Sequence, residues 1–577
     1  MARYQNFRLS LFFTVQDVLQ LPDDRAAFCD HVAPFLRDLR LDKVYLETFR
    51  SETVPREKLA RAKQLFAEQG IASATAMMPV SALQDGHETR IGQPFCYTDP
   101  WAQDLFSGLF RRMAEQFDEI MIDDSFLTNC TCARCREAKG ERDWATFRMA
   151  MLTDFLERHM VGPAREVNES VKIVLKYPTY NESFQRLGYD PRHQPALVDG
   201  IHAGTETRHT TYSLFKNPRY TSYSLIRYLA NLKEHNNGGG WIDNIMCGSL
   251  DAYLEQANLT LLAKAPELTL FCAGLLQTGS WRAALGCRLA ECDAVIGSLG
   301  QPWGIPVYLP AGSSGEDHLY DYLGMCGVPL EPAADFPRAP ELVLLTAASA
   351  CDSDILARLR GHLENGGDAV LTTGFARAMQ PLGLDEFIWI RDSGQKMASA
   401  QFGAFDRGWS SQVRYDYART AIAFPFLEWK VNDINYHVMQ MENALSNLVL
   451  GMSFYAAGRV MLLNTPDNYA QLQLLPVASL DKIRQYLSFS RPVRYLGQAP
   501  VSLFLYDNQT FALQSFLPHG SVAEIAVRGD VDVLTLLDNG HRLERLYQRD
   551  GESRFEIPLD QQAFLPLSYA AKDLSDV

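Results

Sequence analysis

Paired acids and a cluster of cysteines share one short stretch of the sequence, residues 120–140, IMIDDSFLTNCTCARCREAKG. An apolar run typical of a buried strand ends there in Asp123 and Asp124. Carboxyl groups at a strand end can give and take protons in acid–base catalysis. Successive strand residues alternate between faces, so we expect one acid to face a site and the other to hold a loop. We predict that Asp124 faces the site, with Asp123 as the second candidate.

Three cysteines, Cys130, Cys132 and Cys135, follow the acids in C-x-C-x-x-C spacing. Thiolates at this spacing are typical of a zinc site, and four protein ligands leave no open position for water. We expect Cys96 to be the fourth ligand, because the loops after successive parallel strands meet at one end of a sheet. The sequence therefore predicts a structural zinc and no organic cofactor. The alternative is a set of reduced, metal-free thiols.

Strand patterns alternate with helix patterns over the first ~310 residues. This rhythm over this length indicates a (β/α)8 barrel, a TIM barrel in the α/β class. A doubly wound open sheet is the alternative, and it fits less well because no glycine-rich phosphate loop follows the first strand. The strands that we predict are 7–15, 43–49, 71–80, 119–124, 172–178, 200–207, 241–248 and 268–274.

Barrel enzymes place their functional residues at the C-terminal ends of the strands. The sequence has no serine elbow, H-E-x-x-H motif or P-loop, so carboxyl chemistry on a polar substrate is the favoured reading. Asp124 and Glu206 are the predicted pair, since two carboxyl groups can flank a glycosidic bond and one can protonate the leaving oxygen. The predicted substrate contacts are Glu47, Lys176, Tyr177, Tyr180, Arg208, His209, Trp241, Asp243 and Trp281, with Tyr212 and Tyr223 as further stacking aromatics.

Each of these residues also has a structural explanation. Glu206 can pair with Arg208 on the surface, and Glu47 can pair with Arg50. Both aspartates can cap the turn that follows them. Aromatic residues in a barrel belong more often to the core than to a ligand site.

The pattern changes after residue 310. Strand–helix–strand units such as 340–374 indicate a flavodoxin-like α/β domain over 311–488, following the barrel at 1–310. Short alternating strands over 489–577 indicate a small C-terminal β-sandwich.

Composition narrows the functional classes. The 577 residues are 47% hydrophobic and 21% charged, which fits a globular protein. A net charge of −15 argues against nucleic-acid partners, and no apolar run is long enough for a membrane span. Eleven scattered cysteines and the lack of a signal-peptide pattern predict a cytoplasmic protein.

With the barrel, the thiols and the ENGGDAVLTTG unit in view, the chain resembles glycoside hydrolase family 42, the three-domain β-galactosidases. The resemblance implies a homo-oligomer, trimer or dimer, and a zinc loop closed by Cys96, Cys130, Cys132 and Cys135. That family has an Asn-Glu pair after strand four and a nucleophilic Glu at strand seven. Here these positions hold Asp123–Asp124 and Asp243, so the acids on strands four and six look more like the α-galactosidase arrangement.

The sequence thus predicts an exo-acting glycoside hydrolase for galactoside-like or related sugars. One alternative is a non-catalytic carbohydrate-binding or scaffold protein on a decayed barrel. Another is an amidohydrolase or lyase with a catalytic metal, for which His202 and His209 are the nearby candidate ligands.

Overall fold

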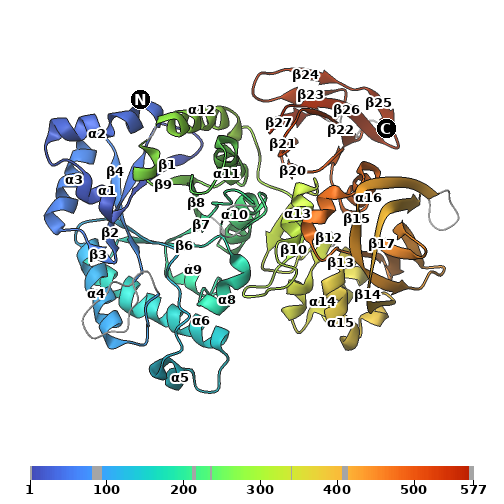
Figure 1. Ribbon diagram of the computed structural model, residues 1–577, viewed down its shortest axis with the longest axis horizontal. Coiled ribbons are helices and arrows are strands. Elements are labelled where there is room, and N and C mark those ends of the chain that lie inside the picture. Colours follow the sequence, from blue (N-terminus) through green and yellow to red (C-terminus); the bar gives the residue numbers. More distant parts are fainter. Residues whose placement is uncertain are drawn as a thin grey trace. The chain divides into compact units, whose positions relative to one another are not determined.

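The computed structural model describes residues 3–80, 94–210, 213, 216–233, 237–277, 279–339, 341–405 and 413–570. The chain divides into two units, Met1–Gly297 and Ser298–Val577 (Figure 1). Across the ranges that are described, no helix combines the length and the apolar character needed to cross a membrane.

The first unit is a closed barrel of eight parallel strands, which confirms the predicted (β/α)8 fold (Figure 1). Strand β1 pairs with both β2 and β9 and so closes the cylinder. A two-residue strand, β3 (Glu52–Thr53), folds back antiparallel onto the end of β2. The barrel strands are β1 (Arg8–Phe13), β2 (Lys43–Arg50), β4 (Ala72–Met78), β5 (Glu119–Ile122), β6 (Lys172–Tyr177), β7 (Gly200–Gly204), β8 (Asn237–Asp243) and β9 (Glu267–Phe271).

Helices surround the barrel, and their starts follow ordinary capping chemistry. In α4 the Asp99 side chain accepts a hydrogen bond from the Trp101 amide, and Pro100 occupies the first turn. The same helix buries Phe106, Leu109 and Met113 against the sheet. The main helices are α2 (Arg25–Asp38), α3 (Arg56–Glu68), α4 (Pro100–Ala114), α6 (Trp144–Phe155), α7 (Gly162–Val167), α10 (Thr221–Leu232), α11 (Leu250–Leu262) and α12 (Gly279–Ile296).

The barrel interior is filled by side chains. Phe12, Tyr45, Met121 and Trp241 belong to one buried cluster across it. At the N-terminal ends of the strands, Lys43 Nζ lies 2.6 Å from Glu119 Oε1 and 2.9 Å from Glu267 Oε2. The C-terminal ends of the strands carry a second set of charged groups, described below.

The seventh barrel strand starts earlier than the sequence analysis predicts. It spans Asn237–Asp243 rather than 241–248, because the glycine run before Trp241 pairs with both neighbouring strands. Gly239 has a φ of +143°, and a Cβ added there would lie 2.1 Å from the Glu267 carbonyl oxygen. Glycine is therefore required where this strand meets β9.

The second unit begins with a mixed sheet. Its parallel strands run in the order β11-β10-β12-β13-β18, which is the flavodoxin-like order, and an antiparallel group β17-β16-β14-β15 extends one edge. Because β10 already belongs to this sheet, the second unit starts before residue 311. The strands are β10 (Ile305–Tyr308), β11 (Leu330–Ala333), β12 (Leu342–Leu345), β13 (Asp368–Thr372), β14 (Ile390–Phe405), β15 (Val413–Trp429), β16 (Asn435–Glu442), β17 (Ser446–Tyr455) and β18 (Gly458–Leu463).

The C-terminal part is a pair of antiparallel sheets, ordered β19-β22-β26-β25 and β20-β21-β27-β23-β24. Tyr495, Phe511, Ile525 and Phe555 come from both sheets and share one buried core, which confirms the predicted β-sandwich. Its strands are β19 (Val493–Leu496), β20 (Val501–Leu505), β21 (Thr510–Ser515), β22 (Ser521–Arg528), β23 (Val533–Leu536), β24 (Arg542–Glu544), β25 (Tyr547–Arg549), β26 (Glu552–Leu559) and β27 (Phe564–Tyr569).

We predict that Gly239→Ala destabilises the protein by about 2–4 kcal/mol, because the new methyl group meets backbone atoms and the φ angle is unfavourable for alanine. Gly108→Ala is the matched control, since Gly108 lies in α4 with nothing within 4 Å of its added Cβ. The control should be neutral or stabilising by up to about 1 kcal/mol. Denaturant unfolding followed by circular dichroism measures both, and equal effects would contradict this account of β8.

Candidate active site

A buried lysine organises the C-terminal end of the barrel. Lys176, on β6, has a side chain that is 3% exposed, and its Nζ lies 4.0 Å from the centre of the Trp241 ring. Three carboxyl groups surround this Nζ: Asp124 Oδ2 at 2.7 Å, Asp123 Oδ1 at 3.2 Å and Glu206 Oε1 at 3.7 Å. These acids raise the pKa of Lys176 against the opposing effect of burial, so the lysine stays charged.

Both aspartates reach Lys176, so the expectation that they face opposite ways is wrong. Strand β5 ends at Ile122, and the two acids lie in the turn beyond it, where strand alternation no longer applies. Asp123 also accepts a hydrogen bond from the Asp124 amide at 2.8 Å, as a turn-capping residue does. The Asp124 side chain is 23% exposed and that of Asp123 is 4% exposed, so Asp124 is the more accessible acid.

Glu206 is held in the segment after β7 and is almost completely buried. Its Oε2 is a buried atom with no hydrogen-bond partner among the described residues. Burial is the largest cause that raises the pKa of Glu206 to about 7; Lys176 opposes the rise and Asp124 adds to it. Burial likewise raises the pKa of Asp124, and Lys176 opposes that rise. Burial thus favours the protonated form of Glu206 near neutral pH, whereas Lys176 favours its ionised form.

Asp124 and Glu206 are close enough to act on one bond. Asp124 Oδ2 and Glu206 Oε1 lie 2.7 Å and 3.7 Å from the same nitrogen atom, so they are no more than about 6.4 Å apart (2.7 plus 3.7). Carboxyl pairs that cleave glycosidic bonds lie between about 5 and 9.5 Å apart. The separation is therefore compatible with that chemistry.

A second carboxylate–cation pair lies at the end of β2. Glu47 Oε2 accepts hydrogen bonds from Arg50 Nε at 2.8 Å and from the Val15 amide at 2.9 Å. Burial raises the pKa of Glu47 to about 7, against the effect of Arg50. Arg50 Nη2 lies 3.6 Å from Asp123 Oδ2, which links this pair to the Lys176 group.

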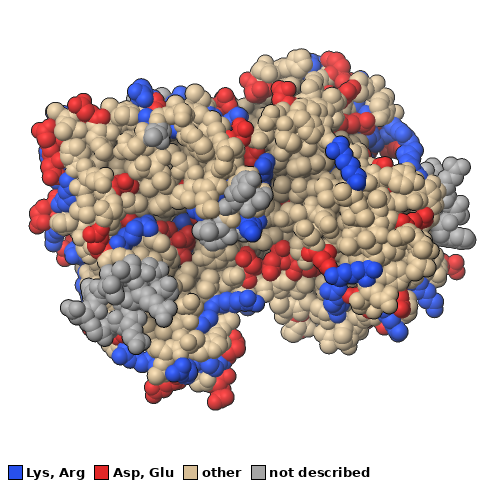
Figure 2. Space-filling view, in the orientation of Figure 1, with Lys and Arg blue, Asp and Glu red and all other residues tan. Residues whose placement is uncertain are grey.

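Arg208 pairs with Asp243 rather than with Glu206. Arg208 Nε donates to Asp243 Oδ1 at 2.9 Å and its Nη2 donates to Oδ2. The Ile245 amide also donates to Asp243 Oδ1 at 3.0 Å. Asp243 is 1% exposed, so this acid at the end of strand seven is fully engaged in holding the loop that follows. Figure 2 shows acidic and basic side chains together near the middle of the barrel unit.

The predicted aromatic contacts divide into two groups. Tyr177, Trp241 and Tyr223 are buried: Tyr177 packs on Phe184 outside the barrel, Trp241 fills the barrel beneath Lys176, and Tyr223 packs on Tyr220. These three aromatic residues belong to the core. Side chains alternate along β6, so Tyr177 points away from the barrel interior that Lys176 enters. Tyr180 and Trp281 are half-buried. Burial raises the pKa of Tyr180, and the charges of Asp124 and Lys176 also act on it. Tyr212 lies outside the described residues.

His202 and His209, the two predicted candidates for metal ligands, do not belong to a group of metal-ligating side chains among the described residues. His202 is buried inside the barrel, where its Nε2 lies 3.3 Å from Thr269 Oγ1, and burial lowers its pKa to about 3. His209 packs beside Gly248 in the loop after β8. Among the described residues, the grouping of cysteine, histidine and acid side chains that suits a metal is the thiol cluster alone.

The sequence analysis treated Arg50 as a simple partner of Glu47. In the structure it connects Glu47 with Asp123, and its side chain is 27% exposed at the barrel end. The spacing of Glu47 and Arg50 predicts that these two residues pair. A bulge in β2 between Glu47 and Phe49 changes the register of the strand, and the sequence does not show this bulge.

The four predicted thiols come together. The sulfur atoms of Cys96, Cys130, Cys132 and Cys135 all lie within 4.8 Å of one another, with Cys96 Sγ 3.6 Å from Cys132 Sγ and 3.7 Å from Cys135 Sγ. A tetrahedral metal with four thiolates at 2.3 Å requires sulfur separations of about 3.8 Å. The cluster therefore fits a four-coordinate metal, and these four side chains would hold it.

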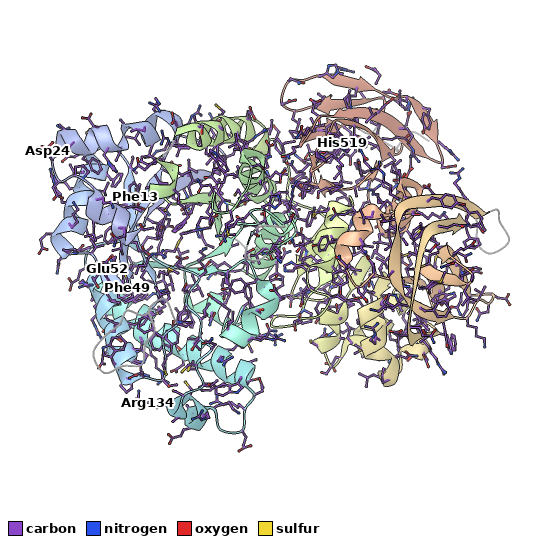
Figure 3. All side chains as sticks on the ribbon, in the orientation of Figure 1. Phe13, Asp24, Phe49, Glu52, Arg134 and His519 are labelled. Carbon is purple, nitrogen blue, oxygen red and sulfur yellow. The ribbon has the colours of Figure 1, made fainter. Side chains whose placement is uncertain are left out.

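The thiol cluster joins the loop that follows Asp124 in the chain to the loop that precedes α4. Cys132 is the N-cap residue of α5 (Ala133–Lys139), and Cys96 precedes α4. Arg134, labelled in Figure 3, lies 2.9 Å from Asp99, the residue that caps α4. Thr128 Oγ1 also donates to the Phe95 carbonyl oxygen at 3.2 Å. The segment after Asp124 is thus fixed to the segment before α4.

Comparisons with known proteins agree with this architecture. Residues 1–285 match the family model described as "Probable glycosyl hydrolase, catalytic domain", 300–392 match "Uncharacterized protein SSO3021, second domain", and 492–564 match "Probable glycosyl hydrolase, C-terminal domain". Uncharacterized protein SSO3021 from Saccharolobus solfataricus is 22% identical over 392 residues. That match takes in 61% of this chain and 64% of the relative, so it spans less than two thirds of its length.

Solved structures share the fold over the full length. Gan42B, a GH42 beta-galactosidase from G. stearothermophilus, superimposes with a TM-score of 0.66 at 12% identity, covering 98% of this chain and 99% of that chain. A beta-galactosidase from Bacillus circulans sp. alkalophilus gives a TM-score of 0.63 at 10% identity with the same coverage. The chain thus has the fold of the GH42 β-galactosidases over its full length, and residues 1–285 and 492–564 match domain models of a probable glycosyl hydrolase.

Proposed function

We propose that this protein is a glycoside hydrolase in which Glu206 is the general acid and Asp124 the ionised partner. The observation that carries the proposal is the placement of both carboxyl groups on one buried cation, Lys176 Nζ, at 3.7 and 2.7 Å. The family-model match over residues 1–285 supports the reaction class. The fold comparison alone would support the architecture and no more.

Roles follow from the surroundings of each acid. Glu206, with a pKa of about 7 and an unpartnered Oε2, keeps a proton near neutral pH and can give it to the leaving oxygen. Asp124 lies closer to Lys176 and is more exposed, which favours its ionised form at a position that substrate can reach. Asp243 is unsuited to either role because Arg208 and the Ile245 amide occupy its oxygens.

The separation of the two acids bears on stereochemistry. Asp124 Oδ2 and Glu206 Oε1 lie no more than about 6.4 Å apart, a limit that includes the roughly 5–5.5 Å separation of enzymes that retain the anomeric configuration. We therefore place Asp124 as the nucleophile of a retaining reaction. Galactosides and related sugars are the substrates to test first, and exo action is part of the proposal. A homo-oligomer and a cytoplasmic location stay predictions.

We predict that a panel of chromogenic α- and β-glycosides will identify a substrate whose first product keeps the anomeric configuration, as seen by proton NMR. Asp124→Asn and Glu206→Gln should each lower kcat by about 10²–10⁴-fold, because the first removes the carboxylate nucleophile and the second removes the general acid. The kcat/KM should fall above about pH 7 as Glu206 loses its proton.

Glu119→Gln is the control for these variants, since Glu119 pairs with Lys43 at the opposite end of the barrel and should leave turnover unchanged. Wild-type turnover in Asp124→Asn or Glu206→Gln would remove the assignment. Sugar binding without turnover across the whole panel would favour the non-catalytic alternative.

We also propose that the thiol cluster holds structural zinc, since four thiolates suit this metal and leave no position for water. The purified protein should then contain about one zinc per chain by mass spectrometry. Cys132→Ser should lose the metal and lower the Tm by several degrees, because the loop beyond Asp124 is released. Cys287→Ser, at an exposed cysteine in α12 outside the cluster, should keep both values. Equal metal content in the two variants would contradict the proposal.

A further inference from the structure

Two buried carboxylate oxygens at the C-terminal end of the barrel have no partner within the described chain. These are Glu47 Oε1 and Glu206 Oε2, on residues that are 0% and 4% exposed. A buried polar atom without a hydrogen bond carries a free-energy cost, which a bound water or a ligand group at these two oxygens would remove. Arg50 Nη2, in the same group, is also buried without a hydrogen bond, and it lies 3.6 Å from Asp123 Oδ2.

The charges of this group are unbalanced. It holds five carboxyl groups, on Glu47, Asp123, Asp124, Glu206 and Asp243. Three cations accompany them, and each is already engaged: Lys176 by three acids, Arg208 by Asp243, and Arg50 by Glu47. Above about pH 7, where Glu47 and Glu206 ionise, a negatively charged ligand would therefore meet more carboxylates than cations in a buried site, where like charges repel strongly.

Glu47 is the residue that keeps Arg50 occupied. The Arg50 side chain is 27% exposed, whereas those of Lys176 and Arg208 are 3% and 10% exposed, so Arg50 is the most exposed of the three cations, although its Nη2 atom is buried. Arginine binds carboxylates well through its planar array of donors. Arg50 Nε already donates a hydrogen bond to Glu47 Oε2 at 2.8 Å, so this donor is not available to a ligand.

We propose that Glu47 is a specificity-determining residue that limits this site to sugars without a negative charge. Its Oε1 accepts a hydrogen bond from a sugar hydroxyl, and its Oε2 holds Arg50 away from the carboxylate of a uronic acid. The inference rests on the proposed function because it takes this end of the barrel as the sugar site. It adds the class of sugar and the residue that selects it.

Equilibrium binding tests the inference independently of turnover. Isothermal titration calorimetry on the full chain compares D-galactose with D-galacturonate, which differ in the carboxylate. The wild-type protein should bind galacturonate at least tenfold more weakly than galactose. Glu47→Gln has nearly the same shape but lacks the charge that engages Arg50, so it should reduce this difference by at least fivefold.

Glu119→Gln is the matched control, because it makes the same change in a glutamate that pairs with Lys43 at the other end of the strands. Its preference should equal that of the wild type, and melting curves establish that both variants fold. Equal binding of the two sugars by the wild type, an unchanged preference in Glu47→Gln, or no binding of either sugar would overturn the inference. Selective binding without hydrolysis of any glycoside would support it while removing the proposed function.

Discussion

The charge on Lys176 is the constraint on which the site depends. Its Nζ holds Asp123 and Asp124, which follow β5, and Glu206, which follows β7, while the lysine itself stands on β6 between them. Without the cation, three buried acids would face each other at short range, and removal of one partner from such a group costs about 3–5 kcal/mol. With it, the ends of three adjacent strands are tied together and the two acids that we assign to catalysis share one anchor.

The remaining features of the barrel end support this arrangement from the sides. Trp241 lies beneath Lys176, and the Arg208–Asp243 pair fixes the loops after β7 and β8. On the other side, Glu47 and Arg50 continue the network to β2. The thiol cluster holds the segment that follows Asp124. A metal there would act on catalysis through the position of Asp124, because a closed four-thiolate site has no free coordination position.

Much of the fold could be predicted from the sequence because it rests on local patterns. Alternating strand and helix patterns indicated the barrel, and the spacing of Cys130, Cys132 and Cys135 indicated a cluster that Cys96 completes. Errors arose where tertiary contacts decide. The glycines of β8 have weak strand propensity, yet the strand pairs with both of its neighbours, and at Gly239 the Glu267 backbone leaves no space for a side chain. Asp123 and Asp124 turn to one cation because β5 ends at Ile122, before either acid, so strand alternation does not apply to them.

The sequence also could not predict which charged side chains at the site pair with one another. Glu206 and Arg208 are two residues apart, but the left-handed backbone at Arg208, with a φ of 54°, directs its side chain to Asp243. Burial of Tyr177 and Trp241 likewise depends on which strand neighbours surround them. Sequence patterns identify the acids at the strand ends, whereas the geometry decides which of them are satisfied and which still lack a partner.

The most direct test of the central claim is the protonation of Glu206. Infrared difference spectra between the wild type and Glu206→Gln, recorded across pH, isolate the carboxyl signal of this residue. The account predicts a protonated carboxyl at pH 6 that ionises with a midpoint near 7. A midpoint near the ordinary glutamate value of about 4.3 would contradict the account, because Glu206 would then have no proton to give at neutral pH.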